Sequence, residues 1–181
     1  MLARVIMLVA LVWGGVARAE EAQLQIVEFG AYTVLQEQGT TDPSFAPTGI
    51  SPLTLVTDPA FVSHTDRIEA QLCRRFGILY RISESLSDPG MSGGLPVQLR
   101  ITHPLIVRPD GEQAKEETWN SMATDTPSIA GFAFREPWEM APGAWTFEVL
   151  SEGRVLASKR FEVVLARAGA APLEGCGVPV S

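Results

Sequence analysis

Apolar and polar residues alternate with a period of two through much of this chain, and this alternation predicts β-strands. It is clearest from Arg67, where Ile68, Ala70 and Leu72 point one way and Cys73 falls in the polar phase. The further alternating stretches are Phe76–Ile82, Val97–Thr102, Ala130–Phe134, Trp145–Val149 and Val155–Val163. None of the chain beyond residue 19 shows the period of a long amphipathic helix. The pattern therefore indicates a protein built from short strands.

Segments rich in glycine, proline and polar residues separate these strands. A change of phase at Ile26–Val27, close to Gly30, predicts a bulge in the first strand. Arg74 stands in the apolar phase, which predicts a bend at Arg74–Arg75. Ser151–Arg154 has the composition of a tight turn and joins the last two strands into a predicted hairpin. The expected loops are 37–52, 87–94 and 109–111, and 112–126 is expected as a loop or a short helical turn.

About seven to eight short antiparallel strands joined by turns predict an all-β fold, an immunoglobulin-like β-sandwich. A closed barrel is the main alternative. The sandwich is expected over residues 20–165, followed by an irregular Ala-, Gly- and Pro-rich tail at 166–181.

The most apolar segment lies at the N-terminus and predicts a cleaved signal peptide over residues 1–19. Arg4 precedes an apolar run, and the small residues of Ala17-Arg18-Ala19 precede the acidic Glu20. This order is typical of a secretory signal, and the run is shorter than the roughly 20 residues of a spanning helix. We therefore expect a periplasmic or secreted protein that does not span the membrane once the signal is removed.

Charge narrows the possible partners. Removing 19 of the 181 residues leaves 162, enough for one domain with a core. The formal net charge of −7 becomes −9, because the signal carries Arg4 and Arg18 and no acid. An acidic surface repels nucleic acid and anionic lipid, so no nucleic-acid partner is expected.

The two cysteines, Cys73 and Cys176, both lie in the predicted mature chain. An even count in an exported protein favours a disulfide. Because Cys73 falls in the polar phase, the bridge would tie the C-terminal tail to the outer face of a sheet. Two free thiols are the alternative.

Four segments in order resemble a family of exported bacterial proteins designated DUF3859. They are Ile26–Tyr32, Phe76–Tyr80, His103–Pro104 with Pro109–Gly111, and Pro142–Val149 with Phe161–Val163. The resemblance covers roughly residues 24–164 and implies an immunoglobulin-like fold and export. It implies no activity, because the family is one of unknown function.

The histidines give no catalytic pattern. The chain contains only His64 and His103, and no Gly-x-Ser-x-Gly nucleophile turn. His103 follows the apolar phase of its strand, which favours a packed or edge histidine that bonds a loop. His64 and Asp66 could offer two metal ligands, fewer than zinc prefers. No metal, cofactor or catalytic residue is predicted.

Acidic and aromatic residues offer weak alternatives. Glu136 and Glu139 flank Trp138, a pattern that fits glycoside chemistry or, more simply, a loop whose tryptophan caps the core. Trp119 lies in a polar stretch and, if exposed, could anchor a ligand or partner. Trp119 and Trp138 are thus the candidate ligand-binding residues.

Three hypotheses follow. The first is a non-enzymatic exported module that acts by contact with an envelope protein. The second is a carbohydrate- or envelope-binding module that uses Trp119 or Trp138. The third is an enzyme of unrecognised type at His103 or at the pair Glu136 and Glu139.

Overall fold

Nine strands and one 3-10 helix make up the part of the chain that the computed structural model describes, residues 24–39, 54–82, 94–167 and 173. They are β1 (Leu24–Gly39), β2 (Thr54–Ser63), β3 (Arg67–Ala70), β4 (Arg75–Ile82), β5 (Leu95–Val107), β6 (Gln113–Ala123), β7 (Ser128–Ala133), η3 (Pro137–Glu139), β8 (Gly143–Ser151) and β9 (Arg154–Leu165). The predicted signal peptide lies outside the described residues. Within the described ranges, no helix is long and apolar enough to cross a membrane.

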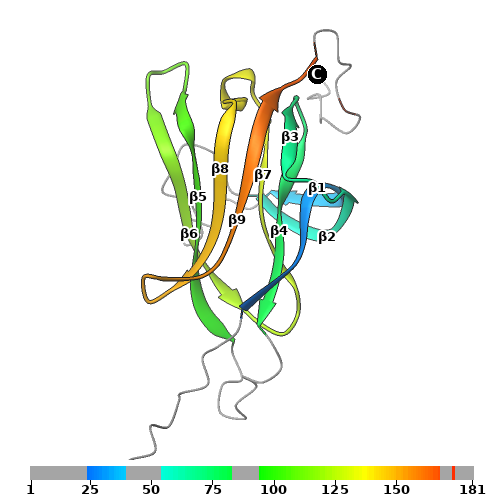
Figure 1. Cartoon of the computed structure of the whole chain (residues 1–181), viewed down its shortest axis with the longest axis vertical. Helices are drawn as coiled ribbons and strands as arrows, with labels where there is room; N and C mark the ends of the chain where they lie inside the picture. The colour runs from blue at the N-terminus through cyan, green and yellow to red at the C-terminus, as the bar shows by residue number, and fades with distance from the viewer. Residues whose placement is uncertain (1–23, 40–53, 83–93, 168–172, 174–181) are drawn as a thin grey trace, which may run out of the picture.

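The strands form two sheets that pack face to face (Figure 1). One sheet has the order β2-β1-β4-β7 and the other β3-β9-β8-β5-β6. Neighbouring strands are antiparallel except β3 and β9, which pair in parallel. This two-layer arrangement is the predicted sandwich and not a closed barrel.

Aromatic side chains from both sheets fill the space between the layers. Phe76 on β4 is fully buried and lies 5.4 to 6.3 Å, ring to ring, from five other aromatic residues. The five are Phe132, Phe134, Trp145, Phe147 and Phe161. Four of them occupy inward positions of β7, β8 and β9, and Phe134 directly follows β7. The period-two pattern of the sequence is what brings them together.

The bulge predicted in the first strand is confirmed. The register of β1 against β4 shifts between Ile26 and Glu28. Three glycines then align across adjacent strands, with Gly30 opposite Gly77 and Gly77 opposite Gly131. A Cβ on Gly131 would overlap the Tyr32 hydroxyl. The absence of that side chain lets Tyr32 lie against the sheet, where it is 5% exposed.

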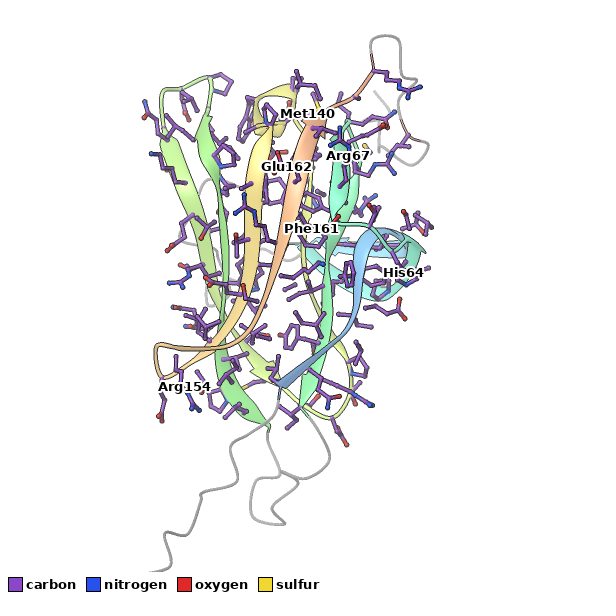
Figure 2. The ribbon with its side chains drawn as sticks, viewed as in Figure 1. His64, Arg67, Met140, Arg154, Phe161 and Glu162 are labelled. Atoms are coloured by element: carbon purple, nitrogen blue, oxygen red, sulfur yellow. The ribbon has the colours of Figure 1, made fainter. Side chains whose placement is uncertain are left out.

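The last hairpin is also confirmed. Ser151 pairs with Arg154, and the two residues between them, Glu152 and Gly153, both have positive φ, at 50° and 77°. This backbone matches the right-handed twist of the flanking strands. Figure 2 shows Arg154 at this turn, at the opposite end of the molecule from Met140, which follows η3.

Two boundaries differ from the sequence-based expectation. The segment expected as a loop or helical turn over 112–126 is largely strand β6, paired along β5. Its inward positions include Glu117 and Ser121, so the apolar alternation that marks a strand is missing there. Strand β2 runs through Asp58–Pro59, which is possible because Pro59 lies on an edge strand.

The strand beginning at Arg67 is shorter than predicted. It ends at Ala70, and the chain turns at Gln71–Arg74, just before the expected bend. The Arg74 amide donates to the Gln71 carbonyl at 3.0 Å, and Cys73 has a φ of 69°. Cys73 is therefore half-buried in a turn and does not point outward from a strand.

Candidate functional site

The outward side of the five-stranded sheet carries polar side chains aligned across four strands. We call this surface the polar face and define it by two rows. The first row is Glu116, Thr102, Thr146 and Arg160, and the second is Thr118, Arg100, Glu148 and Ser158, each in the strand order β6-β5-β8-β9. The alternate residues of the same strands, among them Leu99, Ile101 and Phe147, are buried. The period of two thus separates core from polar face residue by residue.

An ion pair fixes the centre of this surface. Arg100 Nε and Nη2 both lie 2.7 Å from Glu148 Oε2. The side chains are 31% and 17% exposed, so the pair is partly shielded from water. Two donors on one carboxylate hold both side chains in a single geometry. The two central charges of the polar face are therefore ordered before any partner arrives.

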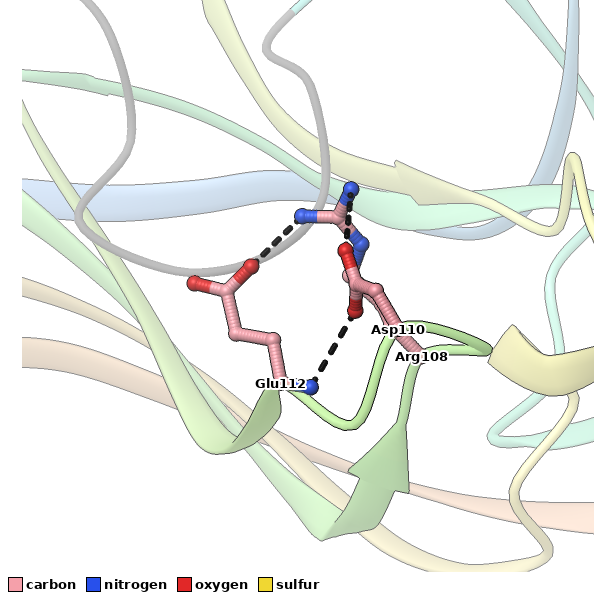
Figure 3. A network of polar contacts seen from close by, with 3 residues as sticks. All are labelled: Arg108, Asp110 and Glu112. Atoms are coloured by element: carbon pink, nitrogen blue, oxygen red, sulfur yellow. Dashed lines mark hydrogen bonds and ion pairs between the residues drawn. The ribbon is translucent and has the colours of Figure 1, made fainter.

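A second polar network closes the β5–β6 hairpin at the edge of the same sheet (Figure 3). Arg108 contacts Asp110 at 3.2 Å and Glu112 at 2.6 Å. The Glu112 amide also donates to the Asp110 carboxylate at 3.1 Å. These bonds hold the turn that was predicted at Pro109–Gly111. Because all three side chains are exposed, their ion pairs contribute little to the stability of the fold.

His103 is buried inside the sandwich, next to Trp145 and Phe132. Its Nδ1 lies 2.8 Å from the Pro104 carbonyl oxygen, which can only accept, so Nδ1 donates. Its Nε2 lies 3.7 Å from Glu117 Oε1, and the two side chains are 0% and 3% exposed. His103 is thus a packed histidine, as expected, and a substrate has no surface by which to reach it. Glu117 is not among the candidate residues of the sequence analysis, because no alternation of apolar residues around it marks its position as inward.

Glu136 and Glu139 lie in the loop between β7 and β8, as the simpler interpretation predicted. Glu139 is 1% exposed, and its Oε2 accepts the Arg135 amide at 2.6 Å and the Glu136 amide at 3.0 Å. The carboxylate therefore satisfies backbone donors at the start of η3. Glu136 is exposed. The two acids thus form a capping box at the start of η3, with Glu139 buried and Glu136 at the surface.

The two candidate tryptophans are half-buried and pack against the core. Trp119 stands opposite Leu99 on the inward side of β6, and Trp138 lies in η3. Each ring therefore covers the edge or end of the sandwich. Neither is the fully exposed aromatic that the ligand-anchor hypothesis requires.

His64 lies at the surface, with its side chain 62% exposed (Figure 2). Its Nε2 is 3.4 Å from Glu28 Oε2, and its ring stacks on Phe61 at 6.3 Å. Within the described parts of the chain, His, Cys, Asp and Glu side chains form no group of three that could hold a metal ion.

The other cysteine of the predicted bridge, Cys176, lies outside the described residues, so the Cys73–Cys176 bridge stays a prediction.

One ionisable group has a displaced pKa. Burial raises the pKa of Tyr80 above its usual value of 10, and a hydrogen bond with Ser121 opposes that shift. The two hydroxyl oxygens are 3.4 Å apart and join β4 to β6 across the layers. Tyr80 is therefore an uncharged bridge between the sheets at neutral pH.

The strand order, the layered aromatic core and the parallel β3–β9 pair define an immunoglobulin-like β-sandwich. A solved immunoglobulin-like protein from Pseudomonas aeruginosa has the same fold, with a TM-score of 0.55 and 22% sequence identity, over 80% of this chain and 99% of that one. The chain belongs to the family described as a domain of unknown function, DUF3859, which matches residues 20–163. The resemblance seen in the sequence is therefore confirmed. No curated protein matches the chain.

Proposed function

We propose that this is an exported, non-enzymatic protein that acts by protein–protein contact, and that the polar face is its contact surface. The observation that carries the proposal is the ordered Arg100–Glu148 pair, set among polar residues that are aligned across four strands. Side chains already held in one geometry lose little entropy on binding. Charged groups arranged on a rigid surface also give a partner both steering and register.

The expected compartment supports this role. The N-terminal pattern of Arg4, apolar run and Ala17-Arg18-Ala19 supports export to the periplasm or beyond. The even cysteine count supports a Cys73–Cys176 bridge in that oxidising environment. Cell fractionation with N-terminal sequencing tests the export step. A mature chain that begins at Glu20 is expected, and retention of Met1 in the cytoplasm would overturn it.

Site-directed photo-crosslinking in cells tests the contact surface. A photoreactive phenylalanine derivative replaces Thr102, which is exposed in the first row of the polar face. The matched control places it at Arg81, which is exposed on the outward side of the other sheet. A discrete crosslinked product from Thr102 and none from Arg81 is expected. Equal crosslinking from both positions, or none from either, would contradict the proposal.

A further inference from the structure

The charges of the polar face are arranged with opposite sign on either side of its midline, which runs between β5 and β8. In the first row the acid Glu116 stands on β6 and the base Arg160 on β9, both exposed. In the second row the two charges lie on the inner strands and their signs are exchanged, with the base Arg100 on β5 and the acid Glu148 on β8. Each charge therefore has an opposite charge at the mirrored strand of the same row.

Such a surface is complementary to itself. A two-fold axis lying along the midline, parallel to the strands, exchanges β6 with β9 and β5 with β8 and keeps each row at its own height. Glu116 of one copy then faces Arg160 of the second, and Arg100 faces Glu148, each twice. We propose that the partner of the polar face is a second copy of this chain, held in a two-fold dimer; this rests on the proposed function of that face.

The remaining residues of the two rows fit the same arrangement. The axis places Thr102 opposite Thr146, and Thr118 opposite Ser158. Small hydroxyl side chains at these positions allow the sheets to approach and can bond one another. No like charges meet in either row. Adjacent strands are about 4.8 Å apart, so Glu116 and Arg160 lie roughly 14 Å apart across the face, far enough to form separate contacts.

The two sheets would pack with their strands nearly aligned, as the twist of β-sheets favours. Because its contacts are charged, the dimer is expected to weaken with salt, whereas an apolar interface would not. Isologous contact of this kind closes on itself and gives a dimer without further assembly.

Charge reversal and its rescue test the proposal on the full mature protein, by sedimentation velocity at low salt. Glu116→Arg and Arg160→Glu each create two like-charge contacts, so each variant alone should lose at least about 100-fold in dimer affinity. Mixed in equal amounts, the two variants should form a heterodimer. One of its contacts joins the two introduced charges, which are opposite in sign, and the other keeps the original pair of Glu116 and Arg160. Glu152→Arg and Arg81→Glu make the same charge changes at exposed sites outside the polar face and should dimerise like the wild type.

Three results would overturn the second-copy proposal: a monomeric wild type at low salt, single variants that dimerise normally, or a mixture that does not associate. The photo-crosslinks separate this failure from that of the proposed function. A crosslinked product at Thr102 that contains a different protein would support the polar face as a contact surface and refute the dimer. A product with the mass of two copies supports both.

Discussion

Substitutions at Cys73 can separate two contributions to stability, the local cost of its backbone conformation and the gain from the predicted disulfide to Cys176. Cys73 has a φ of 69°, in a turn where the Arg74 amide donates to the Gln71 carbonyl at 3.0 Å. A left-handed backbone costs a residue with a Cβ about 1 kcal/mol, and glycine avoids that cost. Cys73→Gly is therefore expected to be about 1 kcal/mol more stable than Cys73→Ala.

The predicted bridge to Cys176 adds a larger and independent effect. It would close a loop of roughly 100 residues, and the chain-entropy treatment gives about 4.7 kcal/mol for a loop of that size. The free energy of unfolding of the oxidised wild type should thus exceed that of Cys73→Ala by about 4.7 kcal/mol. In reductant the two proteins should be close in stability. Neither variant should respond to reductant.

Urea unfolding followed by tryptophan fluorescence, with and without dithiothreitol, measures all of these differences. A wild type whose midpoint is the same in both conditions would refute the bridge and leave the turn untouched. Equal stability of Cys73→Gly and Cys73→Ala would refute the turn conformation and leave the bridge untouched.

Three further predictions concern the core and the loop. The raised pKa of Tyr80 means that its stabilising contribution is complete below about pH 10 and is lost as pH rises through the folded-state pKa. In Tyr80→Phe the free energy of unfolding should therefore fall less steeply at alkaline pH than in the wild type, measured by urea unfolding from pH 8 to pH 11. An unchanged slope would show that Tyr80 does not cause the alkaline loss of stability. Glu139→Gln weakens a charged acceptor of two backbone amides and should cost about 1–3 kcal/mol, with exposed Glu152→Gln within about 0.5 kcal/mol of wild type as its control. Phe76→Ala opens the centre of the aromatic core and should cost about 3–5 kcal/mol, whereas Val62→Ala, at a side chain 60% exposed, should cost under about 0.5 kcal/mol; similar losses in calorimetry would place the core elsewhere.

The strands predicted correctly are those whose inward side chains are nearly all apolar. Strands β5 and β8 bury residues such as Leu99 and Trp145 at every second position over most of their length, and β9 does so at Phe161 and Val163, so the period is visible in the sequence. Strand β6 was missed because Glu117 and Ser121 occupy two of its inward positions. These polar residues are accommodated by His103 and Tyr80, which come from other strands. Their partners are distant in sequence, and a local pattern carries no trace of them.

The same limit explains the candidate site. That Arg100, Glu148 and Arg160 fall in the polar phase of their strands follows from alternation in the sequence. Their alignment in rows depends on the register of β5, β6, β8 and β9, which hydrogen bonding between strands decides. Trp119 shows that local sequence can also mislead. Its polar neighbours suggested an exposed ring, but the pairing of β6 with β5 turns it toward the core.

The sequence by itself determined the all-β class, the positions of most strands, the bulge in β1 and the final hairpin, because each depends on residues close together along the chain. The tertiary structure alone decided that Cys73 sits in a left-handed turn, that His103 meets Glu117 in the interior, and that opposite charges face one another across a midline. Those features join residues from different strands, as where the Cys73 amide donates to the Phe134 carbonyl at 2.7 Å, and they exist only once strand register and sheet packing are set.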